Sequence, residues 1–373
     1  MKSGESKDFI FSVVLLAGTI IGAGVFSLPY IFSRLGVING IFYLIAFTLI
    51  YFVLHWMYGR LLEINKGNYQ FFYLTKKYLP SFISLPAALA ILGELILTLT
   101  IYLILAPVFG QLIFGSSGWI FLLIFWLLGS LFIFAKLSWL GMAEFFGLGS
   151  TFLILGLIIF LGLNRPFQVP LWKNFNWSTF FLPFGPLLFS LTGRPAISKV
   201  VEFYHRFQDK KKKIPLAKII FWGTALPAFV YLIFVLGILR LNPQISPEAF
   251  NSLGFLSPLV LTLLGLIGLI GIWTSYFILG INLRETLISD LRFSRLFSAL
   301  LVLFLPPLLY LIGLRNFLAI ISLAGNVFLA LEAIFIITMW RRAFPQDGRA
   351  WLIWPLYFIF ALAFIYGVVT FVG

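Results

Sequence analysis

Long, uninterrupted runs of apolar residues dominate the hydropathy pattern of the chain. A helix needs about 20 mostly apolar residues to cross the hydrocarbon core of a bilayer. Eleven runs meet this length, at residues 8–31, 35–62, 82–107, 118–135, 137–163, 179–203, 216–240, 254–286, 296–313, 316–340 and 350–371. The strands of a membrane β-barrel are only about half as long. The pattern therefore predicts an all-α integral membrane protein with eleven transmembrane helices.

Composition supports this prediction and excludes several classes of chemistry. Of the 373 residues, 61% are hydrophobic and 10% are charged, whereas about a quarter of the residues in a soluble domain are charged. The longest loops, at 62–81, 203–216, 241–253 and 286–296, are too short to form a soluble domain. The chain has no cysteine and two histidines, which excludes disulfides and argues against a metal centre built from these residues.

The net charge of +14 is explained by topology and not by a nucleic-acid partner. With the N-terminus inside, twenty Lys and Arg residues lie on the inner side of the predicted spans and five on the outer side. The positive-inside rule then places the N-terminus in the cytoplasm and the C-terminus outside. The short loops suggest a bacterial inner membrane. The run Lys210–Lys213 has two readings, a patch for lipid headgroups or a solvated loop.

The first span carries residues that interrupt helices. Gly18, Gly22 and Gly24 fall at its middle, and Pro29 follows. A glycine costs about 1 kcal/mol in a helix interior, and a broken helix in lipid must find other partners for its main-chain groups. Gly18 and Gly22 also form a GxxxG pair, so this span alone leaves helix packing and a true break open.

The sixth span favours the break. Gly193 and Pro195 lie near mid-membrane beside Ser190, Thr192 and Arg194. Helix-breaking residues and polar groups at the same depth indicate a helix that lines a cavity. The two breaks are five spans apart, so the two halves cross the bilayer in opposite directions, as in an inverted-repeat transporter. We expect one transmembrane domain with a first repeat at 1–163, a second at 164–340 and a last helix at 341–373.

Four segments resemble the amino acid/auxin permease family and look like those of an aromatic amino acid permease. They are GTIIGAGVFSLPY (18–30), LFSLTGRPAI (188–197), TSYFILGINLRETL (274–287) and LRNFLAIISLAGNVFLALEAIF (314–335). The resemblance implies the LeuT-type 5+5 fold of the amino acid–polyamine–organocation superfamily, with helices 1 and 6 broken, and symport of amino acids. Arg194 departs from the family, which often has histidine at this position.

The breaks suggest how an amino acid zwitterion would bind. The half-helix after the first break begins with free N–H groups that suit a carboxylate, and free carbonyls at the second break suit an ammonium. Glu94, Thr98 and Tyr102 share one face of the third span because they are four residues apart. The aromatic candidates could equally be core residues. The candidate substrate-binding residues are Gly22, Ala23, Gly24, Thr98, Tyr102, Phe189, Ser190 and Thr192.

A coupling ion is the second expectation. Sodium binds hydroxyl and carbonyl oxygens, and the resemblance implies a sodium site made by the carbonyls of Gly18 and Ile21 with the hydroxyls of Thr274 and Ser275. Hydroxyls inside a helix also bond back to their own carbonyls, which is the alternative reading. Protons are the other candidate ion. We expect no organic cofactor.

Ionisable residues within spans are costly and are candidates for function. Glu94, Glu144, Arg194 and Glu332 are such residues. Glu144, Arg194 and Glu332 lie at a similar depth, about 12–14 Å from the cytoplasmic side at 1.5 Å per residue. They form a candidate inner gate or coupling network, and a static buried pair is the alternative. Arginine stays charged, so a glutamate is the candidate proton carrier.

Four other functions compete with symport of amino acids. A non-transporting amino acid sensor would retain the fold, and an ion-independent uniporter or exchanger would use Arg194 in place of the ion. A channel needs a continuous polar pore, whereas the polar residues cluster at mid-depth. An enzyme is the least favoured, because no nucleophile–base pair or metal motif occurs. The expected partners are an amino acid and the lipid bilayer.

Overall fold

A computed structural model describes residues 3–65, 71–115, 118–134, 140–167, 169–174, 176–207, 215–346, 351 and 353–372, with the main chain only for residues 3–7, 140–145, 206 and 207. All regular structure in these ranges is helical. The long unbroken helices are α3 (Val37–Ile64), α5 (Ser84–Phe114), α11 (Leu216–Leu241), α12 (Pro258–Ser289) and α16 (Ile353–Val372). Further apolar helices are α6 (Trp119–Phe132), α7 (Leu140–Gly162) and α13 (Arg295–Leu311).

Three further spans are interrupted. The first comprises α1 (Ser3–Ile20), the 3₁₀ turn η1 (Ala23–Ser27) and α2 (Leu28–Leu35). Another comprises α9 (Phe184–Leu191) and α10 (Arg194–Phe207), and a third comprises α14 (Phe317–Leu323), the π-helical turn η5 (Ala324–Leu329) and α15 (Ala330–Ala343). The short elements are α4 (Phe71–Tyr78), η2 (Ser81–Ile83), α8 (Trp177–Phe180) and η4 (Phe250–Leu253).

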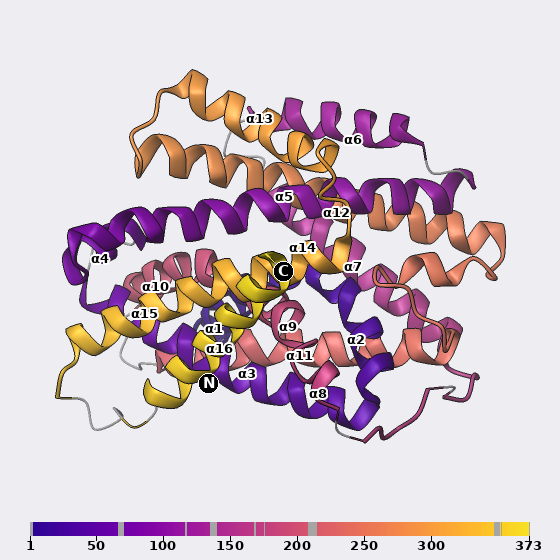
Figure 1. Ribbon diagram of the computed structural model, residues 1–373, viewed down its shortest axis with the longest axis horizontal. Coiled ribbons are helices and arrows are strands. Elements are labelled where there is room, and N and C mark those ends of the chain that lie inside the picture. The colour runs from indigo at the N-terminus through magenta and orange to yellow at the C-terminus, as the bar shows by residue number, and fades with distance from the viewer. Residues whose placement is uncertain are drawn as a thin grey trace.

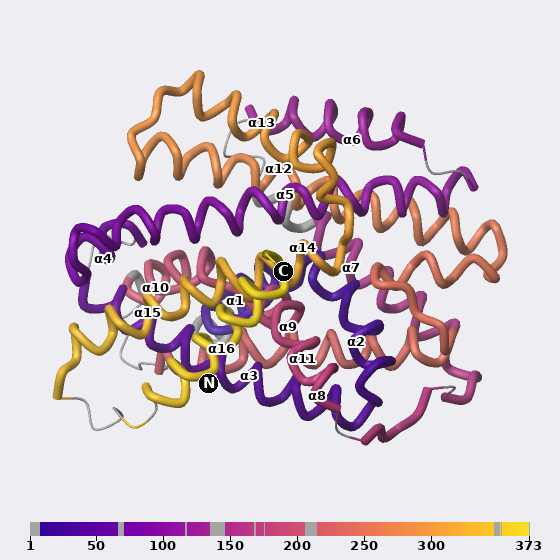
Figure 2. The backbone as a smooth tube through the Cα atoms, in the orientation of Figure 1, coloured from indigo at the N-terminus to yellow at the C-terminus, as the bar shows by residue number. Residues whose placement is uncertain are grey.

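The helices form a layered bundle in which most run along the long axis of the molecule (Figure 1). α6 and α13 lie together at one edge, and α3 lies toward the opposite edge (Figure 2). Among the described residues, six helical segments are long and apolar enough to cross a membrane, and the bent pair formed by α1 and α2 makes a seventh. This confirms a multi-pass helical membrane protein. The count of eleven and the inverted repeat stay predictions.

The surface of the bundle is strongly apolar. Phe42, Trp119 and Phe160 are each more than 70% exposed, and they lie on three different helices. Water would penalise such a surface, because each exposed square ångström of apolar area costs about 25 cal/mol. In a bilayer the same side chains contact lipid, so the exposed residues agree with the membrane location.

The first break lies where the glycines predicted it. α1 ends at Ile20, Gly22 is extended at φ −146° and ψ −161°, and the axis bends by 52° before the chain continues through η1 into α2. Pro29 lies in the first turn of α2, where the missing N–H of proline has no helical partner to lose. The span is therefore broken at Gly22, and Gly18 also packs closely on α7, because a Cβ on Gly18 would lie 2.8 Å from the Leu148 Cδ1.

The second break separates α9 from α10. α9 ends at Leu191, Thr192 is extended at φ −65° and ψ 136°, and α10 starts at Arg194. Pro195 again stands in the first turn of the following half-helix. Each proline therefore lies in the first turn of a half-helix, and the chain changes direction at the residues that precede this helix.

The sequence did not predict α4 or the π-helical turn η5. α4 lies inside the expected loop 62–81, and it forms because Phe71, Phe72 and Leu74 are buried against the bundle. The π-helical turn η5 interrupts the tenth predicted span. At Gly325 a Cβ would lie 2.0 Å from the main-chain oxygen of Gly185, so the turn packs directly on α9. A π-turn adds one residue to a helical turn, and such turns are frequent at functional sites.

Candidate functional site

The two breaks contact each other in the centre of the bundle. A Cβ on Gly24 would lie 2.5 Å from the Ser190 Oγ and 2.7 Å from the Ser190 Cα. Both residues are buried. Only glycine allows η1 and α9 to approach this closely. The structure thus brings together two predicted substrate-binding residues that are 166 positions apart in the sequence.

Tyr231 of α11 joins the carboxyl ends of both half-helices. Its hydroxyl oxygen lies 2.7 Å from the main-chain oxygen of Ile20 and 2.8 Å from that of Ser190, and the two carbonyls share its single proton. The side chain is fully buried. These carbonyls belong to helix ends, which have no helical partners of their own. Sequence reasoning missed Tyr231, because one tyrosine in an apolar span gives no signal when the chain has 14 tyrosines.

Tyr51 of α3 makes a similar contact. Its hydroxyl donates to the main-chain oxygen of Leu188, at 2.6 Å. Two tyrosines from different helices therefore satisfy carbonyls near the end of α9. The predicted role of the Ser190 carbonyl in binding an ammonium must accommodate the bond from Tyr231. A carbonyl oxygen has a second lone pair, so it can still accept from a ligand.

Tyr102 faces the first break. A Cβ on Gly22 would lie 3.7 Å from the Tyr102 Oη, which also lies beside the main chain of Ala23 and the side chain of Ser275. Thr98, one turn earlier on α5, donates to the main-chain oxygen of Glu94 at 2.7 Å. The structure therefore brings Gly22, Ala23 and Tyr102 together.

The remaining predicted substrate-binding residues belong to the second break. Phe189 is buried within α9, 7% exposed. Thr192 lies between the two half-helices and lines a cavity with Arg194. Ser190 donates its side-chain hydroxyl to the oxygen of Pro186, at 2.6 Å, so this hydroxyl bonds within its own helix.

The predicted ion-binding hydroxyls bond within their own helix. Thr274 and Ser275 both donate to the main-chain oxygen of Gly271, each at 3.0 Å. Thr274 lies against α7, because a Cβ on Gly147 would be 2.8 Å from its hydroxyl oxygen. Gly18 lies against Leu148, also of α7. This is the back-bonding arrangement that the sequence left open, and the sodium site stays a prediction.

Arg194 and Glu332 form an ion pair next to the second break. The Arg194 Nε lies 2.8 Å from the Glu332 Oε1, and the guanidinium lies over the ring of Phe71, 5.3 Å from its centroid. Both side chains are largely buried, with 13% and 5% exposed. The pair thus connects α10, α15 and α4. Glu94 is also buried, whereas the side chain of Glu144 lies outside the described part of the chain.

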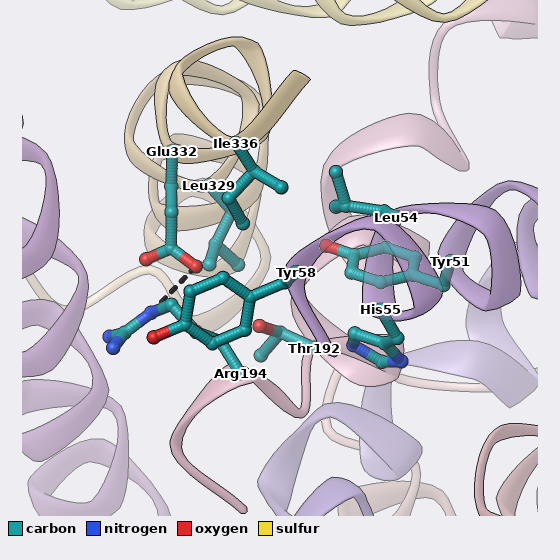
Figure 3. Close-up of a pocket in the computed structure, with 9 residues that line it drawn as sticks. All are labelled: Tyr51, Leu54, His55, Tyr58, Thr192, Arg194, Leu329, Glu332 and Ile336. Atoms are coloured by element: carbon teal, nitrogen blue, oxygen red, sulfur yellow. Dashed lines mark ion pairs between the residues drawn. The ribbon is translucent and has the colours of Figure 1, made fainter. Parts of the chain in front are cut away.

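A small cavity lies between the ion pair and α3 (Figure 3). Its volume is about 10 Å³, enough for about one water molecule. It is lined by Tyr51, Leu54, His55 and Tyr58 of α3, Thr192, Arg194, Leu329, Glu332 and Ile336. His55 accepts or donates one hydrogen bond at Nδ1, 3.0 Å from the Thr224 hydroxyl. The described residues contain no cluster of three His, Cys, Asp or Glu side chains suited to a metal.

Solved structures with a similar fold include two proteins described as transporters. MhsT in complex with L-phenylalanine aligns with a TM-score of 0.55 and 14% identity over 96% of this chain and 97% of its own. Mhp1, a nucleobase-cation-symport-1 family transporter, aligns at 0.57 and 15% identity over 87% and 76%. A manganese transporter from Eremococcus coleocola aligns at 0.62 and 13% identity over 99% and 88%. At these identities the likeness shows the fold alone. No curated protein matches the sequence.

The family model for transmembrane amino acid transporter proteins matches residues 7–278. This range includes both breaks and Arg194. This match confirms the family expected from the four sequence segments. It also assigns the chain to transport and not to catalysis. The chain therefore belongs to the family of transmembrane amino acid transporter proteins.

Proposed function

We propose that this protein is a secondary active transporter that moves amino acids across the membrane by alternating access. The observation that carries the proposal is the direct contact of the two broken helices, where Gly24 packs on Ser190. Main-chain groups freed at a break serve a ligand or line a cavity in membrane proteins. Two breaks that meet at one point supply donors and acceptors within reach of one small molecule.

An amino acid suits these groups because it carries opposite charges on one carbon. The 3₁₀ turn that begins at Ala23 offers N–H groups to a carboxylate, with Tyr102 beside it. The carboxyl end of α9, at Leu191, carries partial negative charge that attracts an ammonium. Tyr231 orients the carbonyl of Ser190 for this role.

The ion pair between Arg194 and Glu332 suits an inner gate. It joins the half-helix α10 to α15, and the guanidinium lies over Phe71 of α4. Parting these elements would open a path from the second break toward the side where α4 and the C-terminal ends of α10 and α15 lie (Figure 1). The excess of Lys and Arg on this side supports a cytoplasmic location, with the N-terminus inside and the C-terminus outside.

The finer architecture belongs to the same proposal. We place the chain in the LeuT-type class, with a repeat at 1–163, an inverted repeat at 164–340 and a last helix after residue 341. Breaks five predicted spans apart support this assignment. The coupling ion is a proton or sodium, and no organic cofactor is needed.

Uptake of radiolabelled amino acids into proteoliposomes tests the proposal. A mixed panel of amino acids is offered with a proton gradient, a sodium gradient or neither. Accumulation driven by one gradient is the expected result and names the ion. Equilibration without accumulation would identify a uniporter or exchanger. Ligand binding without any flux, in protein shown to be folded, would contradict transport and identify a sensor.

A further inference from the structure

Two buried carboxyl groups and one buried guanidinium lie within electrostatic range of one another. Glu94 is on α5, Arg194 begins α10, and Glu332 is on α15. Glu94 is 7% exposed and Glu332 is 4% exposed. If all three groups are ionised, the cluster carries one uncompensated negative charge inside the membrane. Such a charge costs several kcal/mol inside the membrane, so the net charge of this cluster bears on how the protein functions.

The ion pair uses the whole positive charge of the cluster. Arg194 lies 2.8 Å from Glu332 through Nε and Oε1. Arginine remains protonated at any accessible pH, so it cannot exchange a proton. Glu332 therefore has a permanent counter-ion, whereas Glu94 forms no ion pair with any side chain in the described part of the chain.

The immediate surroundings of Glu94 do not neutralise it. The Thr98 hydroxyl has one proton, which it donates to the main-chain oxygen of Glu94 at 2.7 Å, and its 3.4 Å distance to the Glu94 Oε1 is long. Among the side chains that the structure describes, no Lys or Arg forms an ion pair with Glu94. Within the described ranges, the charged groups that face Glu94 are Glu332 and Arg194, and Glu332 repels it.

Helix packing keeps Glu94 close to the pair. The neighbouring Gly93 faces Phe328 of η5, because a Cβ on Gly93 would lie 2.1 Å from the Phe328 Cε1. This contact holds the π-helical turn against α5, one turn before Glu332. This packing keeps Glu94 and Glu332 in the same region, although their two carboxylates repel each other. Packing alone gives no reason to place an unpaired carboxyl group there.

We propose that Glu94 holds one exchangeable positive charge, either a proton or the cationic side chain of a substrate, which enters and leaves with each transported amino acid. This inference rests on the proposed transport function and specifies its coupling. When the site is filled, the charge on Glu94 is neutralised and the cluster carries no net charge. When the site is empty, an ionised Glu94 opposes the passage of the empty transporter through its closed state.

The position of Glu94 connects it to the substrate site. Glu94, Thr98 and Tyr102 are spaced by four residues on one face of α5, which corresponds to about 6 Å per step along the helix. Tyr102 faces the first break at Gly22. A substrate bound at the break therefore lies at one end of this polar row, and Glu94 lies at the other end.

The test compares wild-type protein with Glu94→Gln in proteoliposomes. Two assays are run on each, concentrative uptake under an imposed proton gradient and counterflow of labelled against unlabelled amino acid. For one proton per substrate, a gradient of about 1.4 kcal/mol supports about tenfold accumulation in the wild type. We expect Glu94→Gln to lose accumulation while counterflow remains measurable, because glutamine is neutral without a proton.

The source of the charge is distinguished by the substrate. If neutral amino acids accumulate only with the proton gradient, the charge is a proton. If lysine or arginine is the favoured substrate, accumulates without a pH gradient, and loses its advantage over neutral amino acids in Glu94→Gln, the charge belongs to the substrate. Glu285→Gln is the matched control, since Glu285 is 52% exposed and pairs with Arg284 at the end of α12.

Three results would overturn the inference while leaving transport intact. One is equal accumulation by Glu94→Gln and wild type. Another is accumulation that follows a sodium gradient and ignores the proton gradient. The third is loss of both assays in Glu94→Gln and in Glu94→Asp, with both variants folded by size-exclusion chromatography and thermal unfolding. By contrast, absence of flux in the wild type would reject the proposed function itself.

Discussion

Gly24 and Ser190 are in direct contact, and no other residue type at position 24 allows the backbones to lie so close. A Cβ on Gly24 would approach the Ser190 Cα to 2.7 Å. Main-chain atoms cannot rotate away as a flexible side chain can. The contact therefore sets the distance between the first and second breaks.

We expect Gly24→Ala to separate the two breaks and to reduce amino acid uptake by about tenfold or more, equivalent to about 1.4 kcal/mol. Gly156→Ala is the control, because Gly156 has no atom within 4 Å of its added Cβ. Both variants are assayed by radiolabelled uptake with protein levels matched. Wild-type uptake in Gly24→Ala would show that the spacing of the breaks does not limit transport.

Tyr231→Phe removes the hydroxyl that serves the carbonyls of Ile20 and Ser190. Leaving a buried polar group unpaired costs about 1–3 kcal/mol. We expect a lower melting temperature and a raised KM for amino acid uptake, because Ser190 loses its fixed orientation. Tyr73→Phe serves as the control, since Tyr73 is 37% exposed. A change in melting temperature with an unaltered KM would assign Tyr231 to stability alone.

A double-mutant cycle measures the coupling energy between Arg194 and Glu332. Arg194→Gln or Glu332→Gln leaves one buried charge unpaired, which costs about 3–5 kcal/mol. We expect each single variant to be less stable than the double variant, which carries neither charge. Thermal unfolding measures this coupling, and uptake measured beside it shows the contribution to gating. Additive losses would indicate that the two side chains do not act as a pair.

Arg194→His tests the role of the permanent charge. Histidine loses its proton near neutral pH, whereas arginine does not. If the pair is the inner gate, we expect the uptake of Arg194→His to fall as the pH rises, because a neutral imidazole no longer binds Glu332. A wild-type rate and pH profile in both Arg194→His and Glu332→Gln would remove the pair from the mechanism.

Packing between α5 and α12 offers a test of stability. A Cβ on Gly268 would lie 2.1 Å from the Phe109 Cε1. Gly268→Ala is expected to lower the melting temperature, because overpacking a core costs about 1–3 kcal/mol. Phe109→Leu in the same chain should recover part of this loss by making room. Without any recovery in the double variant, the steric explanation would be wrong.

Much of the secondary structure and both breaks were predictable because their causes are local. A bilayer demands long apolar runs, and glycine and proline interrupt helices wherever they stand. Gly22, Gly193 and Pro195 therefore marked the interruptions in the sequence itself. The π-helical turn at Ala324–Leu329 and the helix at Phe71–Tyr78 left no such mark, since packing against other segments stabilises them.

The sequence by itself determined the membrane location, the family and the positions where two helices break, because hydropathy and helix propensity act between neighbours in the chain. Only the tertiary structure decided which polar groups meet there. Tyr231 reaches carbonyls that are 211 and 41 positions away, and Arg194 pairs with Glu332 from a distant helix. Such partners depend on how the helices pack in three dimensions. An unpaired buried charge costs several kcal/mol, so the stability of the fold depends on these pairings.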